Sequence, residues 1–143
     1  MHWASRAEAL SCYLGSVGNP PKKILLVDDS IVMLSLEADI LTGEGYDVRT
    51  AESVAQMNAV LRDWTPDIIL TDVRMPDIDG TELCRLIKGQ VARLVPVILF
   101  SSLPDRELAR LAKTCGADGF LSKSNGLDSL VERVDDLCQD ILW

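Results

Sequence analysis

The stretch DIILTDVRMPDIDG, residues 67–80, decides how the rest of this sequence is interpreted. An apolar run at residues 68–70 leads to the carboxylate of Asp72, and Pro76 and Gly80 follow at positions typical of turns. Such a run between prolines predicts a buried strand that delivers Asp72 into a loop. In a parallel sheet with helices on both faces, ligands bind at the carboxyl ends of strands, so Asp72 is a candidate functional residue.

The same alternation of short apolar runs with amphipathic stretches extends along most of the chain. We predict strands at residues 22–27, 46–50, 67–71, 95–100 and 119–122. Helices are predicted at residues 30–42, after Ser53, at 81–89, at 104–115 and over 127–141. Strands alternating with helices predict right-handed βαβ units and a parallel sheet. The expected architecture is therefore α/β: a flavodoxin-like, doubly wound (βα)5 sheet with strand order 2-1-3-4-5.

The first of these helices has a defined start, stop and buried face in the prediction. Ser30 is suited to cap its amino end, and Gly43 is expected to stop it. Met33, Leu36 and Ile40 recur at helical spacing and form the expected apolar stripe.

Reactive or polar residues follow four of the predicted strands. Asp28 and Asp29 follow the first, Asp72 the third, Ser101 the fourth and Lys123 the fifth. Carboxylates that converge in one cleft repel one another, which favours a bound cation, and an all-oxygen site suits Mg²⁺. Aspartate can form an acyl phosphate, and an ammonium and a hydroxyl can stabilise the phosphoryl oxygens. The sequence therefore predicts phosphoryl transfer to Asp72.

Over residues 22–142 the sequence resembles the receiver domain of two-component response regulators. The resemblance is carried by ILLVDDS at 24–30, DVRMPDIDG at 72–80, PVILFSS at 96–102 and GFLSK at 119–123. It implies a domain of residues 22–143 that follows an extension and linker at 1–21. It also implies a signalling domain, not an enzyme, with self-catalysed phosphorylation and weak autodephosphorylation at most. The phosphodonor would be a phosphohistidine of a sensor histidine kinase or phosphotransfer protein.

The resemblance also assigns roles to individual residues. Mg²⁺ would be held by Asp28, Asp29, Asp72 and the backbone carbonyl of Arg74. Lys123 would bind the phosphoryl group, Ser101 would be the switch hydroxyl, and Phe120 the aromatic side chain that turns inward. This switch would reshape a face formed by residues 104–115, 119–122 and the last helix, for partner binding or a homodimer. Arg106, Arg110 and Lys113 form a basic patch there, expected either to bind an acidic partner or to be a solvated helix face.

Two positions depart from the common family pattern. Ser124 stands after Lys123 where relatives commonly have a proline in a cis peptide, and a cis bond before a residue other than proline costs about 2.5–4 kcal/mol. The geometry of that peptide is left open. Arg74, two residues after Asp72, borders the phosphoryl site and could steady a phosphodonor or obstruct an attacking water.

Bulk properties narrow the class of protein. The 143 residues suit one domain with a genuine core, and the net charge of −8 argues against nucleic-acid binding by this domain. No apolar run reaches the roughly 18 residues of a membrane span and no secretory signal is evident, so we expect a cytoplasmic protein without membrane contact. The cysteines at 12, 84, 115 and 138 form no metal-binding motif and are expected to be reduced thiols.

Other interpretations remain. Residues 1–14 could form an amphipathic docking helix, with a linker at 15–21, or could be a frayed tail. A haloacid-dehalogenase-type phosphatase also uses aspartate, magnesium and lysine, but requires a second aspartate two residues after the nucleophile, where Arg74 stands. A flavodoxin-like electron carrier would share the topology, but Asp28 and Asp29 would repel its phosphate. A receiver used mainly as a binding or dimerising module is the third alternative.

Overall fold

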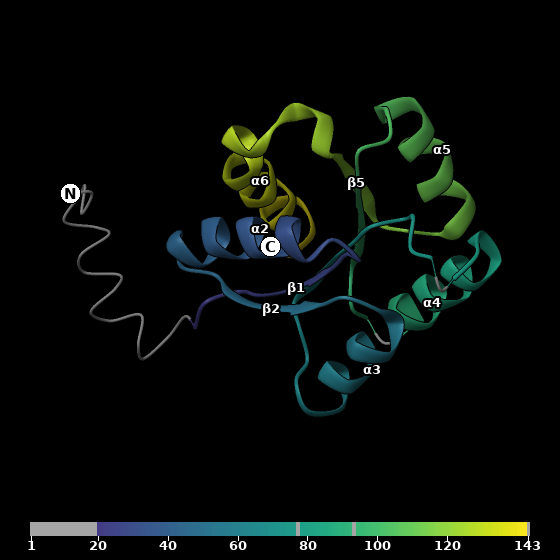
Figure 1. Ribbon diagram of the computed structural model, residues 1–143, viewed down its shortest axis with the longest axis horizontal. Coiled ribbons are helices and arrows are strands. Elements are labelled where there is room, and N and C mark those ends of the chain that lie inside the picture. Colours follow the sequence, from purple (N-terminus) through teal and green to yellow (C-terminus); the bar gives the residue numbers. More distant parts are fainter. Residues whose placement is uncertain (1–19, 77, 93, 143) are drawn as a thin grey trace.

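The computed structural model describes residues 20–76, 78–92 and 94–142 (Figure 1). Its elements in order are β1 Lys23–Val27, α2 Ile31–Gly43, β2 Asp47–Ala51, α3 Val54–Asp63, β3 Ile68–Thr71, α4 Gly80–Ala92, β4 Val97–Ser101, α5 Asp105–Cys115, β5 Gly119–Ser122 and α6 Leu130–Leu142. Two short 3₁₀ segments, Lys123–Asn125 and Leu127–Ser129, join β5 to α6. The helix predicted within residues 1–14 lies outside the described residues.

The strands form one parallel sheet in the order β2-β1-β3-β4-β5, which confirms the predicted flavodoxin-like topology. Val27, the last residue of β1, pairs with Thr71 at the end of β3, and Ser101 at the end of β4 pairs with Ser122 at the end of β5. Because all strands run in one direction, their carboxyl ends meet at the same edge. The residues that follow the strands are therefore brought together there.

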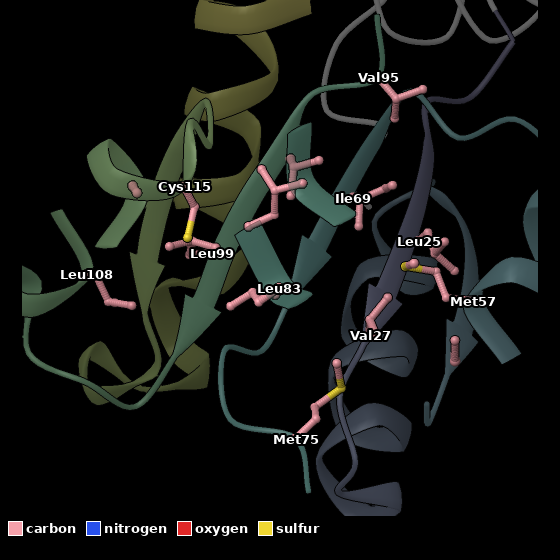
Figure 2. Packing of buried hydrophobic residues seen from close by; sticks show 14 of the residues in the cluster. Leu25, Val27, Met57, Ile69, Met75, Leu83, Val95, Leu99, Leu108 and Cys115 are labelled. Carbon is pink, nitrogen blue, oxygen red and sulfur yellow. The ribbon is translucent and has the colours of Figure 1, made fainter. Parts of the chain in front are cut away.

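Helices cover both faces of the sheet, α2 and α6 on one and α3, α4 and α5 on the other (Figure 1). Alternate side chains of a strand point to opposite faces, so Leu25 and Val27 join the core under α3–α5, and Ile24 and Leu26 join the core under α2 and α6. Figure 2 shows the first of these clusters. Each fully buried leucine contributes roughly 1.5–3 kcal/mol to stability, so both layers hold the sheet.

Two aspartates fix the amino ends of neighbouring strands. Asp67, just before β3, accepts a hydrogen bond at Oδ2 from the N–H of Lys23, the first residue of β1, at 2.8 Å. Asp118, just before β5, accepts one in the same way from the N–H of Val97, the first residue of β4, at 2.9 Å. Both carboxylates lie at the edge opposite to the one where the polar strand ends gather.

The buried face of α2 differs from the apolar stripe that the sequence predicted for this helix. Its buried residues are Leu34, Glu37 and Leu41, whereas Leu36 is 44% exposed. The predicted stripe is therefore shifted by one residue from the face that is buried. The reason is Glu37: a charged residue at the centre of the buried face made the apolar residues beside that face look like the more regular stripe.

The amino end of α2 lies where it was predicted, and the carboxyl end lies slightly beyond its predicted position. Ser30 caps the helix as predicted, since its hydroxyl accepts from the Met33 N–H at 3.3 Å. The helix includes Gly43, and the chain turns away after Glu44, at Gly45, whose φ of 99° lies in the left-handed region that glycine adopts readily.

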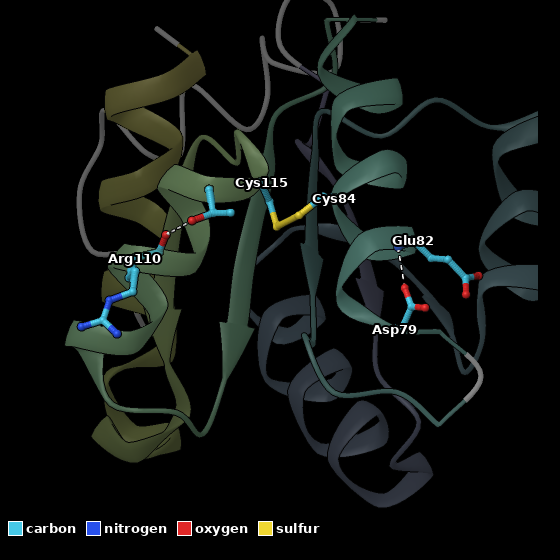
Figure 3. Close-up of a disulfide and its surroundings, with 6 residues drawn as sticks. Asp79, Glu82, Cys84, Arg110 and Cys115 are labelled. Atoms are coloured by element: carbon cyan, nitrogen blue, oxygen red, sulfur yellow. Dashed lines mark hydrogen bonds between the residues drawn. A yellow bond between two sulfur atoms is a disulfide. The ribbon is translucent and has the colours of Figure 1, made fainter.

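The prediction that the cysteines are reduced thiols is wrong for one pair. Cys84 of α4 and Cys115 at the end of α5 form a disulfide (Figure 3). The two residues are 31 positions apart and belong to no cysteine motif, so only the packing of α4 beside α5 brings them together. Cys138, on α6, is a buried free thiol.

Candidate functional site

The carboxylates of Asp28, Asp29 and Asp72 lie together at the carboxyl edge of the sheet. Because Val27 pairs with Thr71, the residues that follow β1 and β3 are held side by side, and the Asp72 N–H donates to the Val27 carbonyl at 2.8 Å. One oxygen from each of the three carboxylates lies within 4.8 Å of the others. Asp28 is buried, Asp72 is half-buried and Asp29 is exposed, so solvent reaches the cluster through Asp29.

Hydrogen bonds orient the carboxylate of Asp72. Its Oδ1 accepts from the N–H of Val73 at 2.7 Å and from the N–H of Arg74 at 3.3 Å. No hydrogen bond among the described residues uses Oδ2, which leaves that oxygen available to a ligand. Burial, and secondarily the charge of Asp28, raise the pKa of Asp72, while Lys123 and the two backbone N–H groups act in the opposite direction.

Lys123 follows β5 and reaches across the sheet edge to the acidic cluster. Its Nζ donates to Asp28 Oδ2, lies 3.5 Å from Glu37 Oε2, and sits 4.9 Å from the centre of the Phe100 ring. Burial alone would lower the pKa of Lys123, but the hydrogen bond to Asp28 and the charges of Glu37, Asp28 and Asp72 outweigh it, so the net pKa is raised. The ammonium is therefore charged and committed to internal carboxylates.

The peptide between Lys123 and Ser124, whose geometry the sequence left open, is trans. The chain enters a 3₁₀ segment at this point, where the Ser122 hydroxyl accepts a hydrogen bond from the Ser124 N–H at 3.2 Å. Lys123 thus reaches Asp28 with a trans peptide and a serine at the next position.

The two residues predicted to form the switch lie on neighbouring strands. Ser101 is 1% exposed, and its hydroxyl accepts from the Leu103 N–H at 3.4 Å. Within the described part of the chain, no hydrogen bond joins Ser101 to Asp72. Phe120 of β5 is half-buried and packs against the core under α3–α5.

The side chains of the predicted basic patch are all exposed on α5, at positions Arg106, Arg110 and Lys113. Figure 3 shows Arg110 with its carbonyl accepting from the Thr114 hydroxyl at 3.0 Å. Arg74, in the loop after β3, is also exposed.

Glu37 is the residue at this site that sequence reasoning missed. It is 1% exposed, and one of its oxygens lies within ion-pair distance of Lys123. Burial raises its pKa to about 7, with the charge of Lys123 acting to lower it and that of Asp28 to raise it. The only signal in the sequence was a glutamate one helical turn from Leu34 and from Leu41, on a face that otherwise packs into the core.

Mg²⁺ fits the donor set found here. The cluster offers only oxygen ligands, it contains three carboxylates, and the exposure of Asp29 leaves room for the waters that Mg²⁺ retains. Asp28, Asp29 and Asp72 are the residues that would hold the ion.

Comparison with known proteins places this geometry in a family. The family model for the response regulator receiver domain matches residues 24–135, a segment that begins within β1 and includes β2 to β5 and the site. The chain belongs to this family. As a receiver domain it shares its fold with the chemotaxis response regulator CheY4 of Vibrio cholerae, with a TM-score of 0.71 and 27% identity over 82% of this chain and 98% of the other. The receiver domain of the TMAO respiratory response regulator TorR gives a TM-score of 0.71 and 30% identity, over 85% and 99% of the two chains.

Curated relatives of this receiver domain are longer proteins. A gliding motility regulatory protein of Myxococcus xanthus is 37% identical over 118 residues, which cover 80% of this chain and 15% of that protein. The transcriptional regulatory protein GlrR of Escherichia coli is 37% identical over 123 residues, 84% of this chain and 27% of the other. The receiver domain thus spans about a quarter or less of the length of these two relatives.

Proposed function

We propose that residues 22–143 act as a phosphorylation-dependent signalling receiver in the cytoplasm and that Asp72 is the phosphoacceptor. The observation that carries this proposal is the convergence of Asp28, Asp29 and Asp72 within 4.8 Å, with the Lys123 ammonium bound to the same cluster. Asp72 has one carboxylate oxygen fixed by backbone N–H groups and the other unused among the described residues. This arrangement suits attack on a phosphorus atom in line with a leaving group.

In the proposed reaction, Asp72 Oδ2 forms a bond to the phosphorus of a phosphohistidine on a histidine kinase or phosphotransfer protein. The phosphorus–nitrogen bond breaks, and its electron pair stays with the departing imidazole. Lys123 and the Ser101 hydroxyl would contact the phosphoryl oxygens. Mg²⁺ held by Asp28, Asp29, Asp72 and the carbonyl of Arg74 would neutralise charge on the phosphoryl group.

A protein phosphodonor is supported by apolar side chains beside the site. Ile31 and Val32, in the first turn of α2 directly after the acidic pair, are 63% and 70% exposed, and Leu36 one turn further is 44% exposed. Exposed apolar groups gathered on one surface favour a protein contact. A partner that covers them would bring its phosphohistidine to the cluster.

The output step of the proposal uses the α5–β5–α6 face. The phosphoryl group adds negative charge and acceptor oxygens, which draw Ser101 towards it and let Phe120 turn inward. The face that carries Arg106, Arg110 and Lys113 would then change its shape and bind a partner or a second copy. Arg74, exposed in the loop after β3, would border the phosphoryl group, where its side chain could steady the phosphodonor or obstruct an attacking water.

The test is labelling with acetyl phosphate in the presence of Mg²⁺. Asp72→Asn removes the nucleophilic oxygen, and we expect it to abolish the mass increase of one phosphoryl group seen for the wild-type chain. Asp63→Asn, which removes an equal charge from an exposed position on α3, serves as the control and should label normally. Undiminished labelling of Asp72→Asn would place the chemistry at another residue.

A further inference from the structure

Glu37 presents an unused acceptor to the lysine of the site. Its side chain is 1% exposed, and Oε2 lies 3.5 Å from Lys123 Nζ. That oxygen is buried and has no hydrogen-bond partner among the described residues. A buried carboxylate oxygen without a hydrogen bond is costly, so its position 3.5 Å from the Lys123 ammonium requires an explanation.

Asp28 supplies the explanation because both of its oxygens are already occupied. Oδ1 accepts from the Ser30 N–H at 2.9 Å, and Oδ2 accepts from Lys123 Nζ. A divalent cation that binds Asp28 through Oδ2 therefore competes with the Lys123 ammonium, whose positive charge it repels at that oxygen. The Lys123 side chain is only 13% exposed, so an ammonium displaced from Asp28 needs another acceptor inside the protein.

We propose that Glu37 is a positioning residue for Lys123, which accepts its ammonium when a divalent cation takes Asp28 and releases it when a phosphoryl group binds at Asp72. The first half of this inference concerns cation binding alone, and the second half rests on the proposed function. Glu37 thus favours the cation and competes with the phosphoryl group for the same lysine.

Two opposite effects follow when the charge of Glu37 is removed. Lys123 then has no second carboxylate and stays on Asp28, so cation binding weakens. Once the cation is saturating, Lys123 is no longer held back, so an acyl-phosphate mimic binds more tightly. Coulomb energies at short range in a partly buried site make each effect about threefold or more.

The variants Glu37→Gln and Glu37→Leu test this inference in the full chain. Glu37→Gln keeps the shape of the side chain, and Glu37→Leu matches its buried apolar neighbours Leu34 and Leu41. If one of the two variants fails to fold, the other still provides the test. Asp39→Asn is the matched control, because Asp39 is an exposed carboxylate on the same helix. Both affinities are measured well above pH 7, where Glu37 is ionised: Mg²⁺ affinity by calorimetry, and beryllofluoride affinity at saturating Mg²⁺ by ¹⁹F NMR.

We expect both Glu37 variants to weaken Mg²⁺ binding and to tighten beryllofluoride binding, while Asp39→Asn changes neither. In a double-mutant cycle, the gain in beryllofluoride affinity should disappear in a Lys123→Met background, since Glu37 acts through that lysine. Unchanged affinities in both Glu37 variants, equal effects of Asp39→Asn, or a gain that persists without Lys123 would each overturn the inference.

The two proposals fail in different ways in this experiment. If the wild-type chain with Mg²⁺ does not bind beryllofluoride, the phosphoacceptor function is refuted, and the Mg²⁺ titrations still decide whether Glu37 supports cation binding. If the wild-type chain binds it normally and the Glu37 variants behave like wild type, only the role of Glu37 is refuted.

Discussion

Glu37 lies where helical periodicity would place an apolar core residue, between Leu34 and Leu41 on the buried face of α2. Its carboxylate is desolvated there and shares the ammonium of Lys123 with Asp28. A buried ion pair of this kind is weak support for stability, because desolvation offsets much of the attraction. A glutamate at this position is therefore better explained by a role in the site than by a contribution to the stability of the core.

The raised pKa of Glu37 predicts a pH dependence of stability in the metal-free protein. Its pKa rises from 4.5 to about 7 on folding, so between these values the folded state keeps a proton that the unfolded state has lost. The free energy of unfolding therefore falls as pH rises through this window, by about 3 kcal/mol for a pKa shift of that size.

The variant Glu37→Gln has no titrating group at this position, so its stability provides the comparison for wild type. Urea unfolding in EDTA at several pH values should show wild type losing stability relative to Glu37→Gln from about pH 4.5 to about pH 7. Parallel curves for the two proteins would show that Glu37 has an ordinary pKa in the folded state.

At the scale of whole elements, the disulfide between Cys84 and Cys115 joins α4 to α5, the helix that carries the basic patch. It closes a loop with a sequence separation of 31 residues, and it ties the two helices at the carboxyl end of α5. The amino end of α5, near Ser101, is not covered by this link. If the α5–β5–α6 face changes shape as proposed, the disulfide would hold the carboxyl end of α5 to α4 during that change.

Closing a loop of this length restricts the unfolded chain and should stabilise the protein by about 3–4 kcal/mol. We expect a dithiol reductant to lower the urea midpoint of the wild-type chain, as the disulfide is converted to two thiols and the reductant to its cyclic disulfide. Cys84→Ala, which cannot form the link, should unfold at the same urea concentration with and without reductant. If the urea midpoint of the wild-type chain is the same with and without reductant, Cys84 and Cys115 are not linked in solution.

How far elements could be predicted depended on the strength of the local pattern. The apolar strands before Asp28, Asp72 and Ser101 end in polar residues, so both the strands and the residues they deliver could be placed from sequence. The buried face of α2 could not, because Glu37 interrupts it. Nor could the pairing of Cys84 with Cys115, since it depends on how two helices pack and not on spacing.

For the molecule as a whole, charge is distributed unevenly between α5 and α6, the two helices that flank β5. The chain carries a net charge of −8, yet Arg106, Arg110 and Lys113 gather on α5. Exposed acidic residues lie on α6 at Glu132, Asp136 and Asp140, whereas the carboxylate of Asp135 accepts a hydrogen bond from the Tyr46 hydroxyl, on the side of α6 towards α2. None of the helices in the described residues is long and apolar enough to cross a membrane.

This distribution predicts a two-fold dimer through α5–β5–α6 in which basic α5 of one copy meets acidic α6 of the other. With Mg²⁺ and beryllofluoride, light scattering should show an increase in mass that Asp72→Asn does not show. Arg110→Glu should weaken the dimer by about 1 kcal/mol, roughly fivefold in Kd. Arg62→Glu, at an exposed position on α3, is the control and should leave the Kd unchanged. An identical mass with and without beryllofluoride would favour a constitutive binding module.

The hydrogen bonds made by Asp67 and Asp118 have a practical consequence for engineering. They lock the alignment of two strand pairs at the end of the sheet remote from the acidic cluster. Because these two bonds do not involve the segments at the opposite end, we expect them to keep the strand pairing when those segments are exchanged. Loops from other receivers could be grafted after β3, β4 or β5 to build chimeras with altered partner choice, provided that both of these aspartates are kept.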